Sequence, residues 1–134
     1  MSSPLAEFLA AKLAYEIDVL DVAQGMKMGD LTVVDTRKLA SWEHGHIVGA
    51  VHVPVSALDV PLPGGLPIDT PLVVYGWGPG CNGATRTAAV LVTKGYSVRE
   101  MIGGLEYWVR SGLTIETESG LSAKDADPLV SAEH

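Results

Sequence analysis

The stretch PLVVYGWGPGCNGATRTAAVLVTKGY (Pro71–Tyr96) contains the most informative pattern in the chain. Its apolar, β-branched start predicts a buried strand. From Gly83 onward, small residues precede an apolar face, and Gly95 follows the end of that face, which predicts a helix. A glycine-rich loop that holds Cys81, the only cysteine of the chain, joins the two elements. A strand followed at once by a helix is the repeating unit of a parallel α/β fold.

Segments on both sides of this unit continue the alternation of strands and helices. We predict strands at Leu31–Arg37, at Ile47–Pro54 and at residues 97–104. Short helices are predicted at residues 38–46, closed by Gly45, and at residues 105–112. The sequence therefore predicts an α/β domain with a mainly parallel sheet.

Two further helices are expected before the first of these strands. Ser3 and Pro4 suit the N-cap and first position of a helix that runs to about Tyr15, and a second helix is predicted from Asp18 to about Met26. The first helix has one apolar stripe. The stripe consists of Leu5, Phe8, Leu9 and Leu13. We expect it to pack on the domain, and the alternatives are a helix that binds a partner or one that forms a homodimer.

The chain divides into three parts on these patterns. Residues 1–30 are the N-terminal helices, which belong to the domain or pack on it, and residues 31–116 are its core. Residues 117–134 are small, polar and acidic, and are expected to form a loosely ordered tail.

Composition limits the function classes. A length of 134 residues suits a single domain, and 47% hydrophobic with 19% charged residues is typical of globular proteins. A net charge of −7 argues against nucleic acid as a partner. No apolar run approaches the roughly 20 residues that span a membrane. The N-terminus lacks the basic start of a signal peptide, and a single cysteine forms no internal disulfide, so we expect a cytoplasmic protein.

The loop around Cys81 has the features of an anion site. Functional sites of open α/β sheets lie beyond the carboxyl ends of the strands, where a helix N-terminus offers free N–H groups and favours a thiolate. Gly78, Gly80 and Gly83 allow successive N–H groups to point inward, and Arg86 supplies a permanent charge for an anionic substrate. Against this, a lone cysteine is often only a small buried apolar residue.

The chain resembles the single-domain rhodanese (thiosulfate sulfurtransferase-like) family in three segments, VVDTRKLASWEHGHIVGAVHVP, PLVVYGWGPGCNGATRTAAVLVTKGY and VREMIGGLEYWVRSGLTI. They follow the family order and extend from about Leu31 to Ile115. The resemblance implies a three-layer domain, with a central, mainly parallel sheet of about five strands flanked by helices.

The resemblance also implies a sulfurtransferase that acts in two steps. Cys81 would attack the outer sulfur of thiosulfate or of a persulfide donor, hold that sulfur as a persulfide, and pass it to a thiol or to cyanide. Arg86 would bind the anionic end of the donor. The terminal sulfur would be surrounded by the backbone of Asn82, Gly83, Ala84 and Thr85. No metal or organic cofactor is implied.

Other residues are assigned supporting roles. Asp35 and Arg37 follow the first buried strand and, by the resemblance, brace the fold beside the loop. His46 is expected to be a hydrogen-bonded structural residue near the site rather than a base. Trp77 either forms a wall of the pocket or covers the underside of the loop. The three nearby histidines have no partner at ligand spacing, which argues against a metal site.

One position departs from the family pattern. The reactive cysteine of the family usually follows the strand tyrosine at once, and here that position is Gly76. Either Cys81 is the nucleophile within an extended loop, with C-x4-R spacing to Arg86, or the usual cysteine is lost and Cys81 is a bystander or resolving thiol. We favour the first interpretation, because Cys81 lies nearest the helix N-terminus.

The sequence is compatible with three functions. The first is sulfur transfer through Cys81, and the second is a non-catalytic rhodanese-like binding or sensing module. The third is a phosphatase or arsenate reductase of the related Cys-loop type, which has a C-x5-R loop one residue larger than the loop found here.

Overall fold

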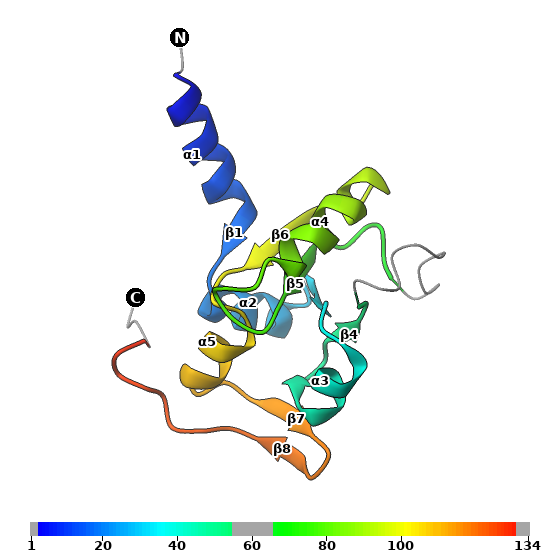
Figure 1. Ribbon diagram of the computed structural model, residues 1–134, viewed down its shortest axis with the longest axis vertical. Coiled ribbons are helices and arrows are strands. Elements are labelled where there is room, and N and C mark those ends of the chain that lie inside the picture. Colours follow the sequence, from blue (N-terminus) through cyan, green and yellow to red (C-terminus); the bar gives the residue numbers. More distant parts are fainter. Residues whose placement is uncertain (1–2, 55–65, 131–134) are drawn as a thin grey trace.

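A parallel sheet forms the centre of the computed structural model, which describes residues 3–54 and 66–130 (Figure 1). Within these residues the sheet has five strands, and every neighbouring pair is parallel. Their order across the sheet is β1 (Glu16–Ile17), β6 (Val98–Met101), β5 (Leu72–Tyr75), β2 (Thr32–Asp35) and β4 (Val51–His52). The predicted α/β class with a parallel sheet of about five strands is confirmed.

Helices cover both faces of this sheet, and the alternation of side chains along the strands explains how. Val33 and Val73 pack with α2 (Val19–Met28) and α5 (Gly104–Arg110) on one face. Their chain neighbours Val34 and Val74 point to the other face and pack with α4 (Gly83–Thr93). Both faces of the central strands are therefore buried, as their uninterrupted apolar sequences require.

The segment Ile47–Pro54, predicted as one strand, belongs to two sheets. β3 (His46–Ile47) pairs with β7 (Ile115–Thr117), which pairs in turn with β8 (Gly120–Ser122), and both pairings are antiparallel. β4 joins the central sheet instead. The prediction of one continuous strand is wrong because Gly49, with φ of +86°, turns the chain between β3 and β4.

The segment after α5 is held against the domain by contacts between Asp127 and Arg110. The N–H of Asp127 donates to the carbonyl of Arg110, and the Asp127 carboxylate lies 2.9 Å from the Arg110 guanidinium. The N–H of Leu129 and this arginine hold the pKa of Asp127 below its usual value. Of the predicted tail, residues 131–134 lie outside the described part of the chain.

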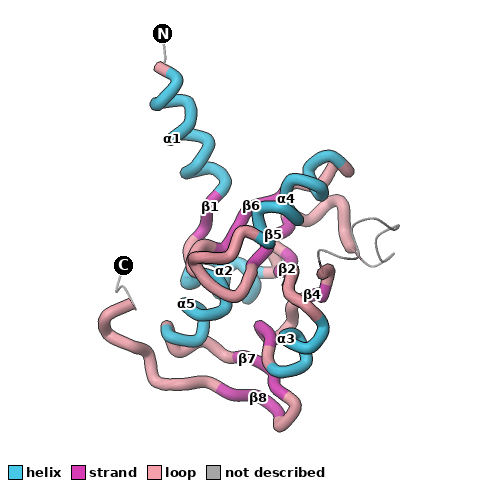
Figure 2. The backbone as a smooth tube through the Cα atoms, viewed as in Figure 1, coloured by secondary structure: helices cyan, strands magenta, loops and turns pink. Residues whose placement is uncertain are grey.

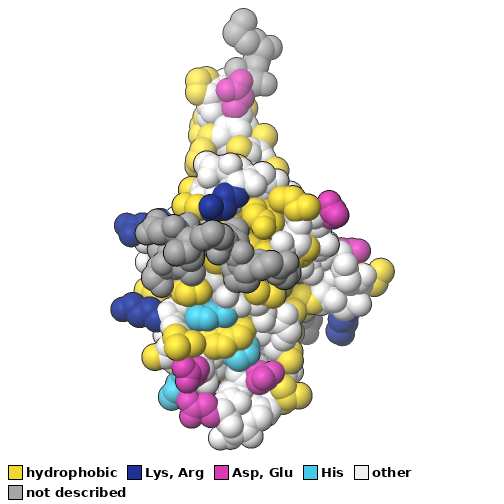
Figure 3. All heavy atoms as spheres, turned by 90° about the vertical axis from the view of Figure 1, so that its right-hand side faces the viewer, with side chains coloured by type: hydrophobic (Ala, Val, Ile, Leu, Met, Phe, Trp, Pro, Cys, Tyr) yellow, Lys and Arg dark blue, Asp and Glu magenta, His cyan; other side chains and the backbone are white. Residues whose placement is uncertain are grey.

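α1 (Pro4–Tyr15) projects away from the rest of the domain (Figures 1 and 2). It has no buried residue, and Leu13 is 78% exposed. Figure 3 shows hydrophobic side chains along the projecting column that α1 forms at the top of the view. Its end is attached to β6 where the Tyr15 hydroxyl donates to Glu100. The expectation that the apolar stripe packs on the domain is therefore wrong.

The remaining helices follow the sequence closely. Asp18 caps α2 by accepting from the N–H groups of Leu20 and Asp21, and the helix ends at Gly29, in the left-handed conformation. α3 (Leu39–His44) ends at Gly45, as predicted. Among the residues described, no helix is long and apolar enough to cross a membrane.

Candidate active site

The candidate site lies where the chain leaves β2 and β5 in opposite directions. These two strands are neighbours, but β2 leads toward α3 and β4 on one side, while β5 leads into α4 and then β6 on the other. Such a divergence opens a crevice at the carboxyl ends of the strands. A cavity of about 770 Å³ occupies this place. The described residues that line it are Thr36, Arg37, Lys38, Leu39, Ser41, Pro54, Trp77, Cys81 and Gly83.

Cys81 borders this cavity directly before the first turn of α4. Its side chain is partly buried, and the N–H of Gly83 approaches its Sγ at 3.4 Å. The N–H of Cys81 donates to the carbonyl of Gly78 at 3.1 Å, which closes a tight turn in the loop. N–H groups in the first turn of a helix have no helical acceptor, so they are free to bind an anion that enters beside the sulfur.

Gly76 and Gly104 determine the position of the loop. A Cβ on Gly76 would lie 2.8 Å from the Sγ of Cys81, so the sulfur occupies space that only glycine leaves open. A Cβ on Gly104 would meet the backbone of Gly76 and Gly78 at 2.8 Å or less. The loop is also bonded to α5, because the N–H groups of Leu105 and Glu106 donate to the carbonyls that follow β5.

A buried polar group supports the other wall of the crevice. Asp35 is fully buried, pairs with the Arg37 guanidinium at 2.8 Å, and accepts a short hydrogen bond from the hydroxyl of Tyr75. That hydroxyl in turn accepts from the N–H of Ile47 at 3.1 Å. Burial, and then the nearby charge of Asp35, raise the pKa of Tyr75 above its usual value. The Arg37 guanidinium is therefore held in an ion pair with a buried carboxylate.

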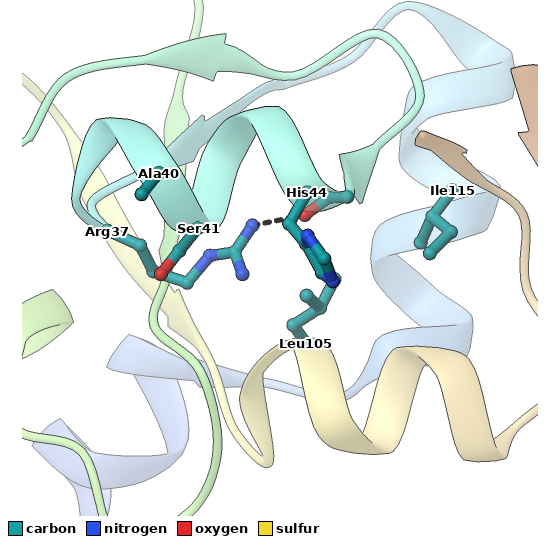
Figure 4. Close-up of a pocket in the computed structure, with 7 residues that line it drawn as sticks. Arg37, Ala40, Ser41, His44, Leu105 and Ile115 are labelled. Atoms are coloured by element: carbon teal, nitrogen blue, oxygen red, sulfur yellow. Dashed lines mark hydrogen bonds between the residues drawn. The ribbon is translucent and has the colours of Figure 1, made fainter. Parts of the chain in front are cut away.

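A second, smaller cavity adjoins the first beneath α3 (Figure 4). It has a volume of about 370 Å³ and shares Arg37 and Ser41 with the cavity at Cys81. Figure 4 shows the Arg37 side chain extended below α3, and its guanidinium donates to the carbonyl of Gly45. Arg37 therefore borders both cavities.

Of the four residues whose backbone is expected around the sulfur, Gly83 is the one found among the described residues that line the cavity, and the side chains of the other three point elsewhere or are exposed. Ala84 is buried against the sheet, Asn82 is exposed, and the Thr85 hydroxyl donates to Glu100 at 2.6 Å. Arg86 is exposed and is not among the described residues that line either cavity. Gly83 and Trp77 do line the cavity at Cys81.

His46, the first residue of β3, lies in a stack of aromatic rings. Its ring lies 3.5 Å from that of Trp42, on which His52 also stacks, and its Nδ1 is 2.7 Å from the carbonyl of Trp42. The described residues contain no cluster of three or more ligands suited to a metal ion.

Comparison with known families decides the relationship of the chain. The model of the rhodanese-like domain matches residues 18–111, which is more than half of the sequence. The chain belongs to the rhodanese-like domain family.

Solved structures agree with this assignment. The rhodanese-like chain is similar to the BH2092 protein of Bacillus halodurans, with 32% identity, a TM-score of 0.75 and 85% of each chain covered. A full-length protein of Lactobacillus plantarum has 30% identity and a TM-score of 0.74 over 83% of this chain and 94% of that one. A thiosulfate sulfurtransferase of Pseudomonas aeruginosa has 26% identity and a TM-score of 0.67 over 75% of this chain and 19% of that one. The search of curated proteins gives no match.

Sequence reasoning missed several residues of this rhodanese-like site. Lys38, Leu39 and Pro54 line the cavity, yet none was singled out. The positions of Lys38 and Leu39 could have been predicted, because both residues directly follow a predicted strand. Residues at such positions lie together at the carboxyl edge of a parallel sheet. The close packing of Gly104 against the loop could not be predicted in this way, because it depends on the distance between two loops.

Proposed function

We propose that this rhodanese-like domain is a sulfurtransferase that carries sulfane sulfur on Cys81. The observation that supports the proposal most directly is the position of the sulfur, which borders the cavity and is approached by the N–H of Gly83 at the start of α4. An anionic persulfide at this place would meet N–H donors that have no other acceptor.

The proposed reaction has two balanced steps. The Cys81 thiolate attacks the outer sulfur of thiosulfate, the sulfur–sulfur bond of the donor breaks, and sulfite leaves with the electron pair. The Cys81 persulfide is then attacked at its terminal sulfur by a thiolate or by cyanide, and the Cys81 thiolate is restored as the leaving group. No external oxidant or reductant is consumed, and no proton transfer is required when both nucleophiles are anionic.

The contact between Gly76 and Cys81 supports Cys81 as the nucleophile. Because the Sγ lies next to the point where a Cβ of residue 76 would stand, the sulfur occupies nearly the place that a side chain directly after β5 would reach. The extended loop thus brings Cys81 back to the end of the strand. The C-x4-R spacing also argues against a Cys-loop phosphatase or arsenate reductase.

A non-catalytic binding module is the second candidate function. The observation that favours it is the projecting α1, whose apolar side chains are exposed. The expected homodimer through this helix and the expected cytoplasmic location both stay predictions.

Mass spectrometry and a turnover assay separate these functions. Incubation with thiosulfate is expected to add one sulfur atom to the intact protein, and later addition of cyanide is expected to release thiocyanate and restore the original mass. Cys81→Ser is expected to do neither. Wild-type protein that gains no sulfur and shows no turnover would favour the binding module, and Cys81-dependent hydrolysis of an aryl phosphate would favour the phosphatase.

A further inference from the structure

The cavity at Cys81 is much larger than the ions used to assay sulfur transfer. Its volume of about 770 Å³ is within the range of roughly 300–1,000 Å³ typical of sites for organic ligands. Thiosulfate has five heavy atoms and cyanide has two, so either ion would contact only the part nearest the sulfur. The rest of the cavity surface therefore has no role in the reaction with these ions.

Two large apolar side chains line that remaining part. Trp77 is 56% exposed and follows β5, while Leu39 is 59% exposed and begins α3 on the opposite side of the crevice. Pro54 adds a third apolar surface. Exposed apolar side chains that line one cavity mark a place where an apolar ligand group is bound.

One cation accompanies these apolar groups. Lys38 lines the cavity and is exposed, and it forms no ion pair with any residue that the structure describes. Arg37, its neighbour, is already paired with Asp35. In a chain with a net charge of −7, an unpaired lysine at the cavity favours a ligand with an anionic group.

We infer that the sulfur acceptor is a small organic thiol that carries both an apolar, ring-sized group and an anionic group. The apolar group lies between Trp77 and Leu39, the anionic group faces Lys38, and the thiolate reaches the sulfur bound to Cys81. This inference rests on the proposed sulfurtransferase function and extends it to the class of acceptor.

The transfer step is the same for any such thiol. Its thiolate attacks the terminal sulfur of the Cys81 persulfide and forms a new sulfur–sulfur bond. The bond between that terminal sulfur and the Sγ of Cys81 breaks, and Cys81 leaves as the thiolate. The product is the persulfide of the acceptor, and the total charge is unchanged, because the acceptor thiolate becomes a persulfide anion while the Cys81 persulfide anion becomes a thiolate.

Four acceptors test the inference with thiosulfate as the donor. Para-(mercaptomethyl)benzoate carries a ring and a carboxylate, phenylmethanethiol carries only the ring, mercaptopropionate carries only the carboxylate, and cyanide carries neither. For each acceptor, kcat/KM is measured in the wild type and in each variant, and the variant-to-wild-type ratios are compared. Differences in intrinsic reactivity between the acceptors cancel in these ratios.

Each variant is expected to lower kcat/KM most for the acceptors that carry the group placed next to the substituted residue. Trp77→Ala is expected to lower kcat/KM for the two ring-bearing thiols by about tenfold more than for cyanide, because the ring loses its aromatic neighbour. Lys38→Met is expected to lower kcat/KM for the two carboxylates by about three- to fivefold more than for phenylmethanethiol, since a partly exposed charge pair is weak.

Matched control variants remove similar side chains elsewhere. Leu39→Ala is compared with Leu121→Ala, which removes a 70% exposed leucine from β8, and Lys38→Met is compared with Lys124→Met in the exposed C-terminal segment. The two distant variants are expected to match the wild type with all four acceptors. Equal effects of Trp77→Ala or Lys38→Met on every acceptor, with cyanide turnover present in the wild type, would overturn the inference.

A binding measurement distinguishes failure of the inference from failure of the proposed function. Para-methylbenzoate has the ring and the carboxylate but no sulfur, and it is expected to slow alkylation of Cys81 by iodoacetamide in the wild type. The protection is expected to weaken in Trp77→Ala and in Lys38→Met. Absence of thiocyanate formation would overturn the proposed function, whereas absence of protection would overturn the inference. Equal variant-to-wild-type ratios for every thiol tested would also overturn the inference.

Discussion

At the scale of single residues, the contact between Gly76 and Cys81 is the most specific feature of the site. Gly76→Ala would place a methyl group 2.8 Å from the Sγ, which is closer than real Cβ contacts, so the sulfur must move. If Cys81 is the nucleophile as proposed, kcat/KM for thiosulfate and cyanide is expected to fall by about ten- to a hundredfold, because the displaced sulfur loses its near-attack geometry. Steady-state kinetics checks this prediction.

Gly78→Ala provides the matched comparison for this variant. Among the residues that the structure describes, a Cβ on Gly78 would meet Glu106 alone, at an ordinary distance of 3.7 Å or more. Its loss of activity is expected to be much smaller than that of Gly76→Ala. Similar activities in the two variants would show that the space beside the sulfur is not what positions Cys81.

Tyr75 gives a prediction about pH. Its pKa is raised in the folded protein by burial and by Asp35, whereas a tyrosine in an unfolded chain ionises near pH 10. Above that pH the unfolded chain loses a proton that the folded protein keeps, so the stabilising contribution of Tyr75 decreases as pH rises. Tyr75→Phe is expected to be less stable than wild type at neutral pH, because Asp35 and Ile47 lose a hydrogen-bond partner.

Urea unfolding of both proteins at about pH 8 and about pH 11 measures this effect. The difference in free energy of unfolding between wild type and Tyr75→Phe is expected to shrink by about 1 kcal/mol at the higher pH. A difference that stays constant would show that the phenol ionises equally well in the folded protein.

At the scale of elements, the sequence predicted the helices and strands whose apolar residues form one continuous pattern and are buried together. β2, β5 and α4 lie where the pattern indicates. β1 has only two residues and is held by pairing with β6, so no local pattern could predict it. The division of Ile47–Pro54 depends on the turn at Gly49 and on a partner strand far along the chain.

The exposure of α1 predicts how its residues affect stability. Leu13→Ala is expected to change the free energy of unfolding by less than about 0.5 kcal/mol, because the side chain makes little contact with the domain. Leu91→Ala removes a fully buried side chain from α4 and is expected to cost about 2–5 kcal/mol. Denaturant unfolding compares the two variants at low protein concentration.

The same helix is where the predicted homodimer would form. If it does, light scattering is expected to show a dimer for the wild type and a monomer for the double variant Leu9→Glu and Leu13→Glu. A wild-type monomer at all accessible concentrations would contradict the homodimer, and the exposed stripe would then have no partner within a second copy of the chain.

At the scale of the whole molecule, the site is assembled by the topology of the sheet. Because β2 and β5 are neighbours and their following loops diverge, Lys38 and Leu39 face Trp77 and Cys81 across a crevice. The sequence predicted a site at Cys81 and its loop, since glycines, a thiol and a helix start adjoin there, and the structure places Cys81 at the cavity. It could not place Lys38 against that loop, because the two are joined only through strand order, nor show that Arg86 lies outside the described cavity lining.

The most direct test of sulfur transfer through Cys81 is the intact mass of the protein after incubation with thiosulfate. The wild type is expected to gain one sulfur atom and to lose it to cyanide with release of thiocyanate, while Cys81→Ser is expected to keep its original mass and to form no thiocyanate. Thiocyanate formation that persists in Cys81→Ser would contradict sulfur transfer through Cys81, because another group would then carry the sulfur.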